Sequence, residues 1–270
     1  MSKQLKTLSG PEGGLDPRCL VDQIIQKSAS QSTVHHRSNT LKKFLKARFS
    51  LAESSGLYLT LLLVALLGAA CIFGAIAEDV VSNDPLTTVD VHFSAWLHAH
   101  PVDSITGALL LITHLHSTLG VTVMTLAVSA YLWVRRLRMR VLKLTLAVFG
   151  GMLLNVLLKH LFVRPRPHFN NPLLTLTSYS FPSGHTLMAT VFYGALCMLI
   201  VTRVRKWRWR VLAIASAAGL ILLVGFSRIY LGVHYLSYVL AAIAEGLAWL
   251  AFCLVLVEAL ERRWKVTQEK

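Results

Sequence analysis

Six apolar segments of about 20 residues each constrain the fold of this 270-residue chain. A helix needs about 20 apolar residues to cross the roughly 30 Å hydrocarbon core of a membrane, and a spanning segment must satisfy its own backbone hydrogen bonds. Only 15% of the residues are charged, against about 25% in soluble domains. We therefore expect an all-helical, polytopic membrane protein with spans at about 56–77, 115–134, 144–162, 185–202, 211–227 and 235–257.

The stretch 92–113 is less uniformly apolar than these six, because it contains Trp96, Pro101 and several histidines. Such a composition is typical of short helices that lie at a membrane interface. We expect interfacial helices here, in the first outer loop. A seventh span is the alternative.

Basic residues are clustered, and their positions predict the orientation of the chain. The net charge of +14 would suggest nucleic acid in a soluble protein, but here the bases gather in the N-terminal tail, in the 135–143 and 203–210 loops, and in the C-terminal tail. These four regions alternate correctly for six spans with both termini in the cytoplasm. We expect a protein of the bacterial inner membrane without a nucleic-acid partner, whose connections 78–114, 163–184 and 228–234 face outward.

The chain divides into three parts on this interpretation: a basic cytoplasmic tail (1–52), a six-span domain (53–260) and a short basic C-tail (261–270). In the first part, Leu41, Phe44, Leu45 and Phe49 share one helical face, which favours a helix lying on anionic inner-leaflet lipids. A solvated tail is the equal alternative. We expect no cleavable signal peptide before the first span, and the four cysteines form no disulfide or metal pattern.

Four bases stand apart from these clusters, at the outer ends of the predicted spans: Lys159, Arg164, Arg166 and Arg228. Ionisable groups at membrane depth are costly, and they usually face a protein cavity that serves a substrate. Four cations on one side therefore indicate an anionic ligand. The alternative is that the long side chains extend to outer-leaflet headgroups.

Two histidines lie at the same predicted level as these cations. Pro182-Ser183-Gly184 breaks the chain before an apolar helix, so that backbone N–H groups are left to bind an anion, and His185 follows in the first turn. His234 opens the last span after a turn through Gly232. Arginines can fork two hydrogen bonds onto phosphate oxygens, so the pattern favours a phosphate.

Three ordered stretches carry a specific resemblance: a Lys and an Arg-Pro pair at 159–167, Pro-Ser-Gly-His at 182–185, and a Ser-Arg pair with a following His at 227–234. Together they resemble the signature of the type 2 phosphatidic acid phosphatase superfamily, which is K-x6-R-P, P-S-G-H and S-R-x5-H-x3-D. The resemblance covers about residues 56–257.

The resemblance implies a metal-independent phosphatase without a cofactor. In it His234 attacks phosphorus and forms a phosphohistidine, while His185 protonates the leaving oxygen and then activates water. The groups implied to hold the phosphate oxygens are Lys159, Arg166 and Arg228 with the backbone of Ser183 and Gly184. Arg164 is not part of the signature, and we expect it to support the pocket from behind or to contact a headgroup.

An outward-facing pocket favours membrane lipids as substrates. By family analogy the candidates are undecaprenyl pyrophosphate, ranked first, phosphatidylglycerol phosphate and phosphatidic acid. A catalytically silent lipid-phosphate binder and a lipid phosphotransferase are the alternatives, whereas no broken-helix repeat supports a transporter. The sequence does not predict an oligomeric state.

The signature aspartate four residues after His234 is replaced by Tyr238. A carboxylate there would orient the imidazole and stabilise its positive charge, which a phenol does less well. Three interpretations remain: Tyr238 orients His234 through its hydroxyl, the protein binds phospholipid without turnover, or an outer-loop acid takes over. The candidate acids are Asp79, Asp84, Asp90 and Asp103; Glu245 is too far along the helix, at about 16 Å.

If Tyr238 occupies the orienting position, Tyr238→Asp should raise turnover, because it restores the carboxylate. Phosphate release from a detergent-solubilised lipid phosphate measures this. An unchanged or lower rate would count against an orienting role at this position.

Overall fold

The computed structural model describes residues 54–82, 85–100, 102–167, 174 and 178–268. The N-terminal tail with its expected interfacial helix lies outside the described residues, as does Asp84. Residues 61–270 form one compact unit, and the described part of the other unit is the short stretch 54–60 at the start of helix α2.

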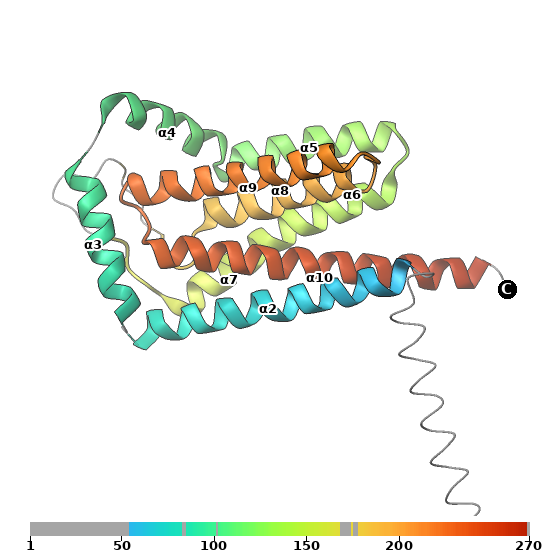
Figure 1. The fold of residues 1–270 in the computed structure, drawn as a ribbon, viewed down its shortest axis with the longest axis horizontal. Coiled ribbons are helices and arrows are strands. Elements are labelled where there is room, and N and C mark those ends of the chain that lie inside the picture. Colours follow the sequence, from blue (N-terminus) through green and yellow to red (C-terminus); the bar gives the residue numbers. More distant parts are fainter. Residues whose placement is uncertain (1–53, 83–84, 101, 168–173, 175–177, 269–270) are drawn as a thin grey trace, which may run out of the picture. The chain divides into compact units, whose positions relative to one another are not determined.

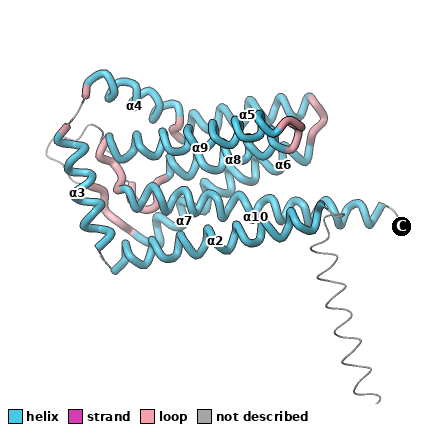
Figure 2. Tube along the Cα trace, viewed as in Figure 1, coloured by secondary structure: helices cyan, strands magenta, loops and turns pink. Residues whose placement is uncertain are grey.

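Helices account for all the regular structure in the part of the chain that is described (Figures 1 and 2). They are α2 (Ser54–Ser82), α3 (Pro85–Ala99), α4 (Asp103–Leu115), α5 (Thr118–Val134), α6 (Arg138–Thr145), the π-helical segment η1 (Leu146–Gly150), α7 (Gly151–Phe162), α8 (Gly184–Val201), α9 (Trp207–Tyr230) and α10 (Leu236–Gln268). The all-helical fold class is confirmed.

Five stretches within these helices are long and apolar enough to cross a membrane: Leu57–Ser82, Arg138–Phe162, Gly184–Val201, Trp207–Tyr230 and Leu236–Glu261. A sixth span is made if α4 and α5, which meet at an angle of 57°, count together. The chain is a multi-pass membrane protein. A straight span over 92–113 is not formed, because α3 ends at Ala99 and α4 begins at Asp103.

Helix α8 is the centre of the unit, packed against α7, α9 and α10. Its Leu187, Ala189 and Val191 are fully buried. A core of these and other apolar side chains extends to α5 and α6. Where α6 passes into α7 the chain takes the wider π-helical turn η1, and the indole of Trp249 on α10 donates a hydrogen bond to the Ala147 carbonyl there at 3.0 Å.

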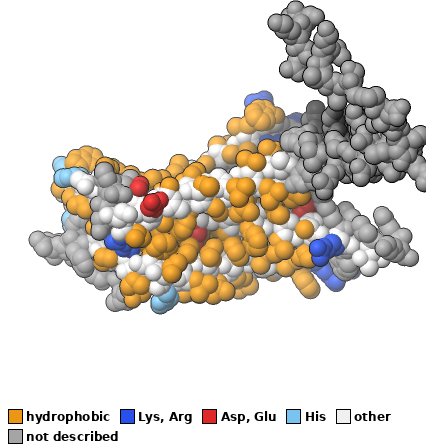
Figure 3. All heavy atoms as spheres, turned by 90° about the horizontal axis from the view of Figure 1, so that it is seen from below, with side chains coloured by type: hydrophobic (Ala, Val, Ile, Leu, Met, Phe, Trp, Pro, Cys, Tyr) orange, Lys and Arg blue, Asp and Glu red, His pale blue; other side chains and the backbone are white. Residues whose placement is uncertain are grey.

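Polar and apolar surfaces are distributed as a bilayer requires. Figure 3 shows a face on which hydrophobic side chains fill the middle and charged side chains gather toward the ends. The basic turns between α5 and α6 and between α8 and α9 lie at one end of the unit, and α3 and α4 lie at the other (Figure 1). At the basic end Lys143 forms a salt bridge of 3.0 Å with Glu261.

The bend between α4 and α5 requires glycine at position 120. A Cβ atom on Gly120 would lie 2.0 Å from the Leu115 carbonyl oxygen, which belongs to the backbone and cannot move aside as a side chain would. A Cβ atom on Gly107 of α4, by contrast, would have no neighbouring atom within 4 Å.

Gly120→Ala should therefore destabilise the folded protein by about 1–3 kcal/mol or more, the usual cost of overpacking. Gly107→Ala is the matched control, and it should be neutral or stabilising by up to about 1 kcal/mol because alanine favours the helix. Thermal unfolding in detergent measures both. Equal transition temperatures for the two variants would contradict the bend as described.

Candidate functional site

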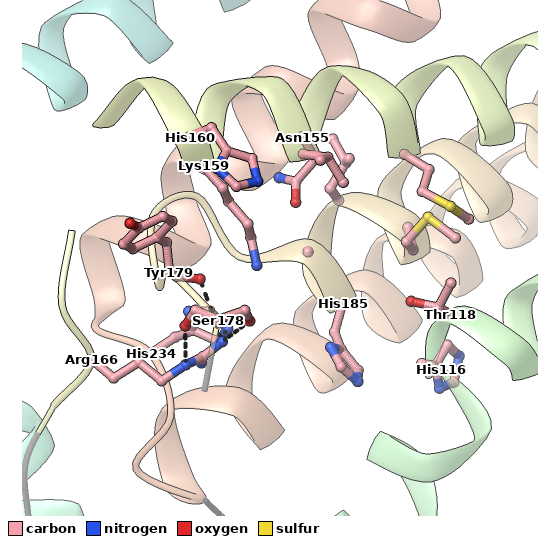
Figure 4. Close-up of a pocket in the computed structure, with 15 residues that line it drawn as sticks. His116, Thr118, Asn155, Lys159, His160, Arg166, Ser178, Tyr179, His185 and His234 are labelled. Carbon is pink, nitrogen blue, oxygen red and sulfur yellow. Dashed lines mark hydrogen bonds between the residues drawn. The ribbon is translucent and has the colours of Figure 1, made fainter. Parts of the chain in front are cut away.

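One cavity of about 600 Å³ collects most of the residues singled out in the sequence. From the three signature stretches its lining includes Lys159, Arg166, Gly184, His185 and His234, and other segments add further polar side chains (Figure 4). Stretches that lie up to 75 residues apart in the chain thus meet at one place, as the sequence predicted they should.

Arg166 is fixed in the cavity wall by backbone oxygens. Its Nε donates to the Ser178 carbonyl at 2.8 Å and its Nη1 to the Val233 carbonyl at 2.9 Å, while Nη2 donates to the Ser178 hydroxyl at 2.9 Å. Burial lowers the pKa of Arg166 from its ordinary value. Because the carbonyls hold the guanidinium without neutralising it, Arg166 keeps its charge for an anion.

His234 is almost wholly buried, with 1% of its surface exposed. The turn that carries it is closed by its own N–H, which donates to the Arg228 carbonyl at 3.2 Å, and Gly232 adopts a φ of 70° that suits glycine. Burial, reinforced by the positive charges of Arg228, Arg166 and Lys159, holds the pKa of His234 well below its ordinary value. The imidazole is therefore neutral at physiological pH and can act as a nucleophile.

Both ring nitrogens of His234 have neighbours. The Ser180 hydroxyl lies 3.1 Å from Nδ1, and Nη1 of Arg166 lies 3.4 Å from Nε2 (Figure 4 shows the second contact). The sequence singled out Arg166 but assigned no role to Ser180.

Arg228 is fully buried beneath this cluster and does not itself line the cavity. Its Nη1 donates to the Thr113 hydroxyl at 3.1 Å. Its Nε and Nη2 have no hydrogen-bond partner among the described residues. A buried guanidinium with two unused donors is costly by itself, and an anion nearby would lower that cost.

Gly184 lets α8 begin close to α7. A Cβ atom at this position would lie 3.1 Å from Oδ1 of Asn155 and 3.6 Å from Nζ of Lys159. The first backbone N–H groups of α8 have no partner within the helix, so the Lys159 ammonium and the start of α8 face the same space. The amide of Asn155 also donates to Glu245 at 3.1 Å.

Ser183 differs from the expectation. Its N–H donates to the Tyr238 carbonyl at 3.2 Å, and its hydroxyl lies 3.0 Å from the Thr186 hydroxyl. The residue is fully buried and does not line the cavity. Its backbone N–H is thus already used in the fold, whereas Gly184 and His185, the next two residues, line the cavity.

Arg164 and Tyr238 line a second cavity of about 420 Å³ rather than the first. Arg164 donates to the Val80 carbonyl. The ring of Tyr238 packs edge-on against Phe181 and Tyr235, with centroids 5.1 and 5.2 Å apart. No hydrogen bond joins Tyr238 to His234 in the described part of the chain, so the structure does not favour Tyr238 as the residue that orients the imidazole.

Asp90, one of the candidate acids, lines this second cavity. Both of its oxygens accept hydrogen bonds from Ser237, one from the backbone N–H at 2.9 Å and one from the hydroxyl. Burial raises the pKa of Asp90, and these hydrogen bonds oppose the rise. Asp90 thus serves the first turn of α10 and not the imidazole of His234.

Among the further polar groups that line the cavity, Asn155 and His116 were not singled out in the sequence. Asn155 lies one helical turn before Lys159 within an apolar segment, and that spacing is a signal that would have found it. His116 is held by the Ile112 carbonyl at 2.8 Å and by the Tyr193 hydroxyl at 2.6 Å. Nothing in the sequence links His116 to its partner on α8, which lies 77 residues away.

Comparisons with known proteins show similarity over part of the chain. A family model described as the PAP2 superfamily matches residues 140–262. Phosphatidylglycerophosphatase B of Bacillus subtilis is 41% identical over 106 residues, which cover 38% of this chain and 52% of that protein. Undecaprenyl-diphosphatase of Sulfolobus acidocaldarius is 37% identical over 106 residues, which cover 37% of this chain and 47% of that protein. The chain spans about half the length of these curated relatives.

A solved structure shows the same fold over a larger part of the chain. It is a transmembrane PAP2-type phosphatidylglycerolphosphate phosphatase from Bacillus subtilis, with a TM-score of 0.65 and 26% identity, covering 73% of this chain and 96% of that one. The residues matched by the family model include all three stretches that build the cavity. The chain therefore belongs to the PAP2 superfamily.

Proposed function

We propose that the protein hydrolyses a phosphate ester or pyrophosphate on a membrane lipid through a phosphohistidine at His234. The observation that carries this proposal is the shared cavity, in which two imidazoles meet Lys159 and Arg166 with the charge of Arg228 close behind. Phosphoryl transfer depends mostly on positioning and on neutralising the charge of the phosphate oxygens, and this set of residues provides both.

Each step uses one side chain of the cavity. Nε2 of His234 forms a bond to phosphorus as the bond to the lipid oxygen breaks, and His185 gives its proton to that oxygen. Water then attacks the phosphohistidine while His185 takes up the water's proton, so that the N–P bond breaks and inorganic phosphate leaves. A covalent intermediate divides one difficult step into two easier ones. The chain supplies this chemistry without a cofactor in our proposal.

Lys159, Arg166 and the first N–H groups of α8 hold the oxygens that carry the transferred charge. These donors are in place before the anion arrives, because Arg166 is bound to three backbone or hydroxyl oxygens and Gly184 abuts Lys159. Donors that need no rearrangement during the reaction are the most effective in lowering its barrier.

The cavity also explains why a lipid is the substrate that we favour. Beside the charged residues its wall includes the apolar side chains of Met152 and Val156 on α7 and of Leu187 and Met188 on α8. A phosphate with an attached hydrocarbon chain matches a lining that combines charged and apolar side chains. By analogy with the relatives we rank undecaprenyl pyrophosphate first, followed by phosphatidylglycerol phosphate and phosphatidic acid.

We further propose that the cavity opens to the outer side of a bacterial inner membrane, with both termini in the cytoplasm. The support is the basic end of the unit, where the α5–α6 and α8–α9 turns lie, opposite α3 and α4 (Figure 1). Positive loops remain on the cytoplasmic side.

His234→Ala should lower phosphate release by about 10³-fold or more, because the nucleophile is lost. His114→Ala, which removes an exposed histidine on α4, is the matched control and should keep the wild-type rate. The measurement is inorganic phosphate released from the three lipids in detergent, with EDTA present throughout.

Loss of wild-type activity in EDTA would contradict the metal-independent mechanism. Lipid binding without phosphate release would identify a silent binder instead. Phosphate release that gives way to a phosphorylated product when an acceptor lipid is added would identify a phosphotransferase.

Orientation is tested by single cysteines in a background without the native Cys19, Cys71, Cys197 and Cys253. We expect a cysteine at His100 to react with a membrane-impermeant maleimide in intact cells, and a cysteine at Lys206 to react only after permeabilisation. The reverse pattern would place the cavity on the cytoplasmic side.

A further inference from the structure

The imidazole of His234 has a neutral hydrogen-bond partner in the place where the family signature supplies a carboxylate. We propose that Ser180 is the positioning residue for His234, and that its hydroxyl fixes the tautomer in which Nε2 is the nucleophile. The proposal rests on the function proposed above, because it concerns the same imidazole. Neither the family match nor the sequence pattern assigns this role.

The Ser180 hydroxyl has a single proton, and its position determines which role the oxygen can take toward His234. Its oxygen lies 3.2 Å from the Val233 carbonyl oxygen and 3.1 Å from Nδ1 of His234. A carbonyl only accepts hydrogen bonds, so the hydroxyl proton goes to Val233. The lone pair that remains can accept a hydrogen bond from Nδ1–H of His234.

The contact at Nε2, on the other side of the His234 ring, indicates the same tautomer independently. Nη1 of Arg166 lies 3.4 Å from Nε2 of His234, and a guanidinium can only donate. Nε2 must then carry a lone pair and no proton. Since a neutral imidazole has one N–H, the proton lies on Nδ1, in agreement with the contact to Ser180. The low pKa of His234, caused by burial and nearby cations, keeps the ring in this neutral form.

Ser180 is held rigidly enough to act in this way. It is fully buried, and its N–H donates to the Arg164 carbonyl at 2.9 Å. The next residue, Phe181, is also fully buried, and the ring centroids of Phe73, Phe162 and Tyr238 lie 6.0, 5.0 and 5.1 Å from its own. The hydroxyl therefore stays in one place relative to the ring.

For two acidic groups, Asp90 and Glu245, the hydrogen bonds shown among the described residues go to partners other than His234. Asp90 accepts both of its hydrogen bonds from Ser237, and Glu245 accepts one from Asn155. Tyr238 faces the second cavity. Ser180 is thus the side chain that contacts Nδ1, and it orients the ring without adding a negative charge to a pocket that must bind an anion.

The test combines turnover with a direct measurement of the tautomer. Ser180→Ala should lower kcat about tenfold and leave KM nearly unchanged, since a hydrogen bond of about 1.4 kcal/mol corresponds to that factor. Ser180→Thr keeps the hydroxyl and should recover most of the loss. In ¹⁵N spectra of histidine-labelled protein, the His234 signals, assigned by their loss in His234→Ala, should show the Nδ1–H tautomer in wild type and a shift toward Nε2–H in Ser180→Ala.

Ser180→Asp should change the pH profile of the reaction, which would not happen if residue 180 had a purely structural role. A carboxylate against Nδ1 favours the charged ring, so the acid limb of the pH profile of kcat/KM should move to higher pH. Thermal unfolding shows whether each variant is folded, and the tautomer measurement applies to any folded variant.

Wild-type turnover together with a wild-type tautomer in Ser180→Ala would overturn the proposal. A rise in turnover above wild type in Tyr238→Asp would also overturn it, because position 238 would then reach the ring. A further outcome is that neither wild type nor any variant releases phosphate while the tautomer still shifts in Ser180→Ala. In that outcome the proposed function fails and the role of Ser180 in positioning the ring stands.

Discussion

The site depends on positive charges that the fold holds close to one neutral imidazole. Burial and then the charges of Arg228, Arg166 and Lys159 lower the pKa of His234, and like charges gathered in a medium of low dielectric constant repel one another strongly. Packing and neutral oxygens hold them in place, as Arg166 shows with its carbonyl partners. An anion bound among these cations reduces their mutual repulsion, and a phosphate can contact several of them at once through its oxygens.

The connections between helices, rather than the helices themselves, bring these groups together. Two backbone hydrogen bonds join these connections to one another: the N–H of Ser180 donates to Arg164 and that of Ser183 to Tyr238, while the N–H of His234 closes its own turn by donating to Arg228. Phe181 lies between the first two and is buried against aromatic rings from three other segments. Tyr238 therefore supports the wall of the site in two ways. Its ring packs against Phe181, and its backbone carbonyl accepts the hydrogen bond from Ser183.

Much of the fold and the composition of the cavity could be predicted from the sequence, because both follow from local patterns. Segment length and hydropathy indicate the spans, and motif spacing brings together Lys159, Arg166, His185 and His234. The side-chain partners could not be predicted in the same way. Whether Nδ1 of His234 meets position 238 or position 180 depends on how a loop folds against α10, and the same holds for the N–H of Ser183 and for Arg164, which turned to a second cavity.

The most direct test of the account is an experimental structure with orthovanadate, which mimics a phosphoryl group during transfer. The account predicts vanadium bound to Nε2 of His234, with its oxygens contacted by Lys159, Arg166 and the N–H groups at the start of α8, and with Nδ1 still on the Ser180 hydroxyl. Vanadate bound away from His234, or through Nδ1, would contradict the claim that these residues form one phosphoryl-transfer site.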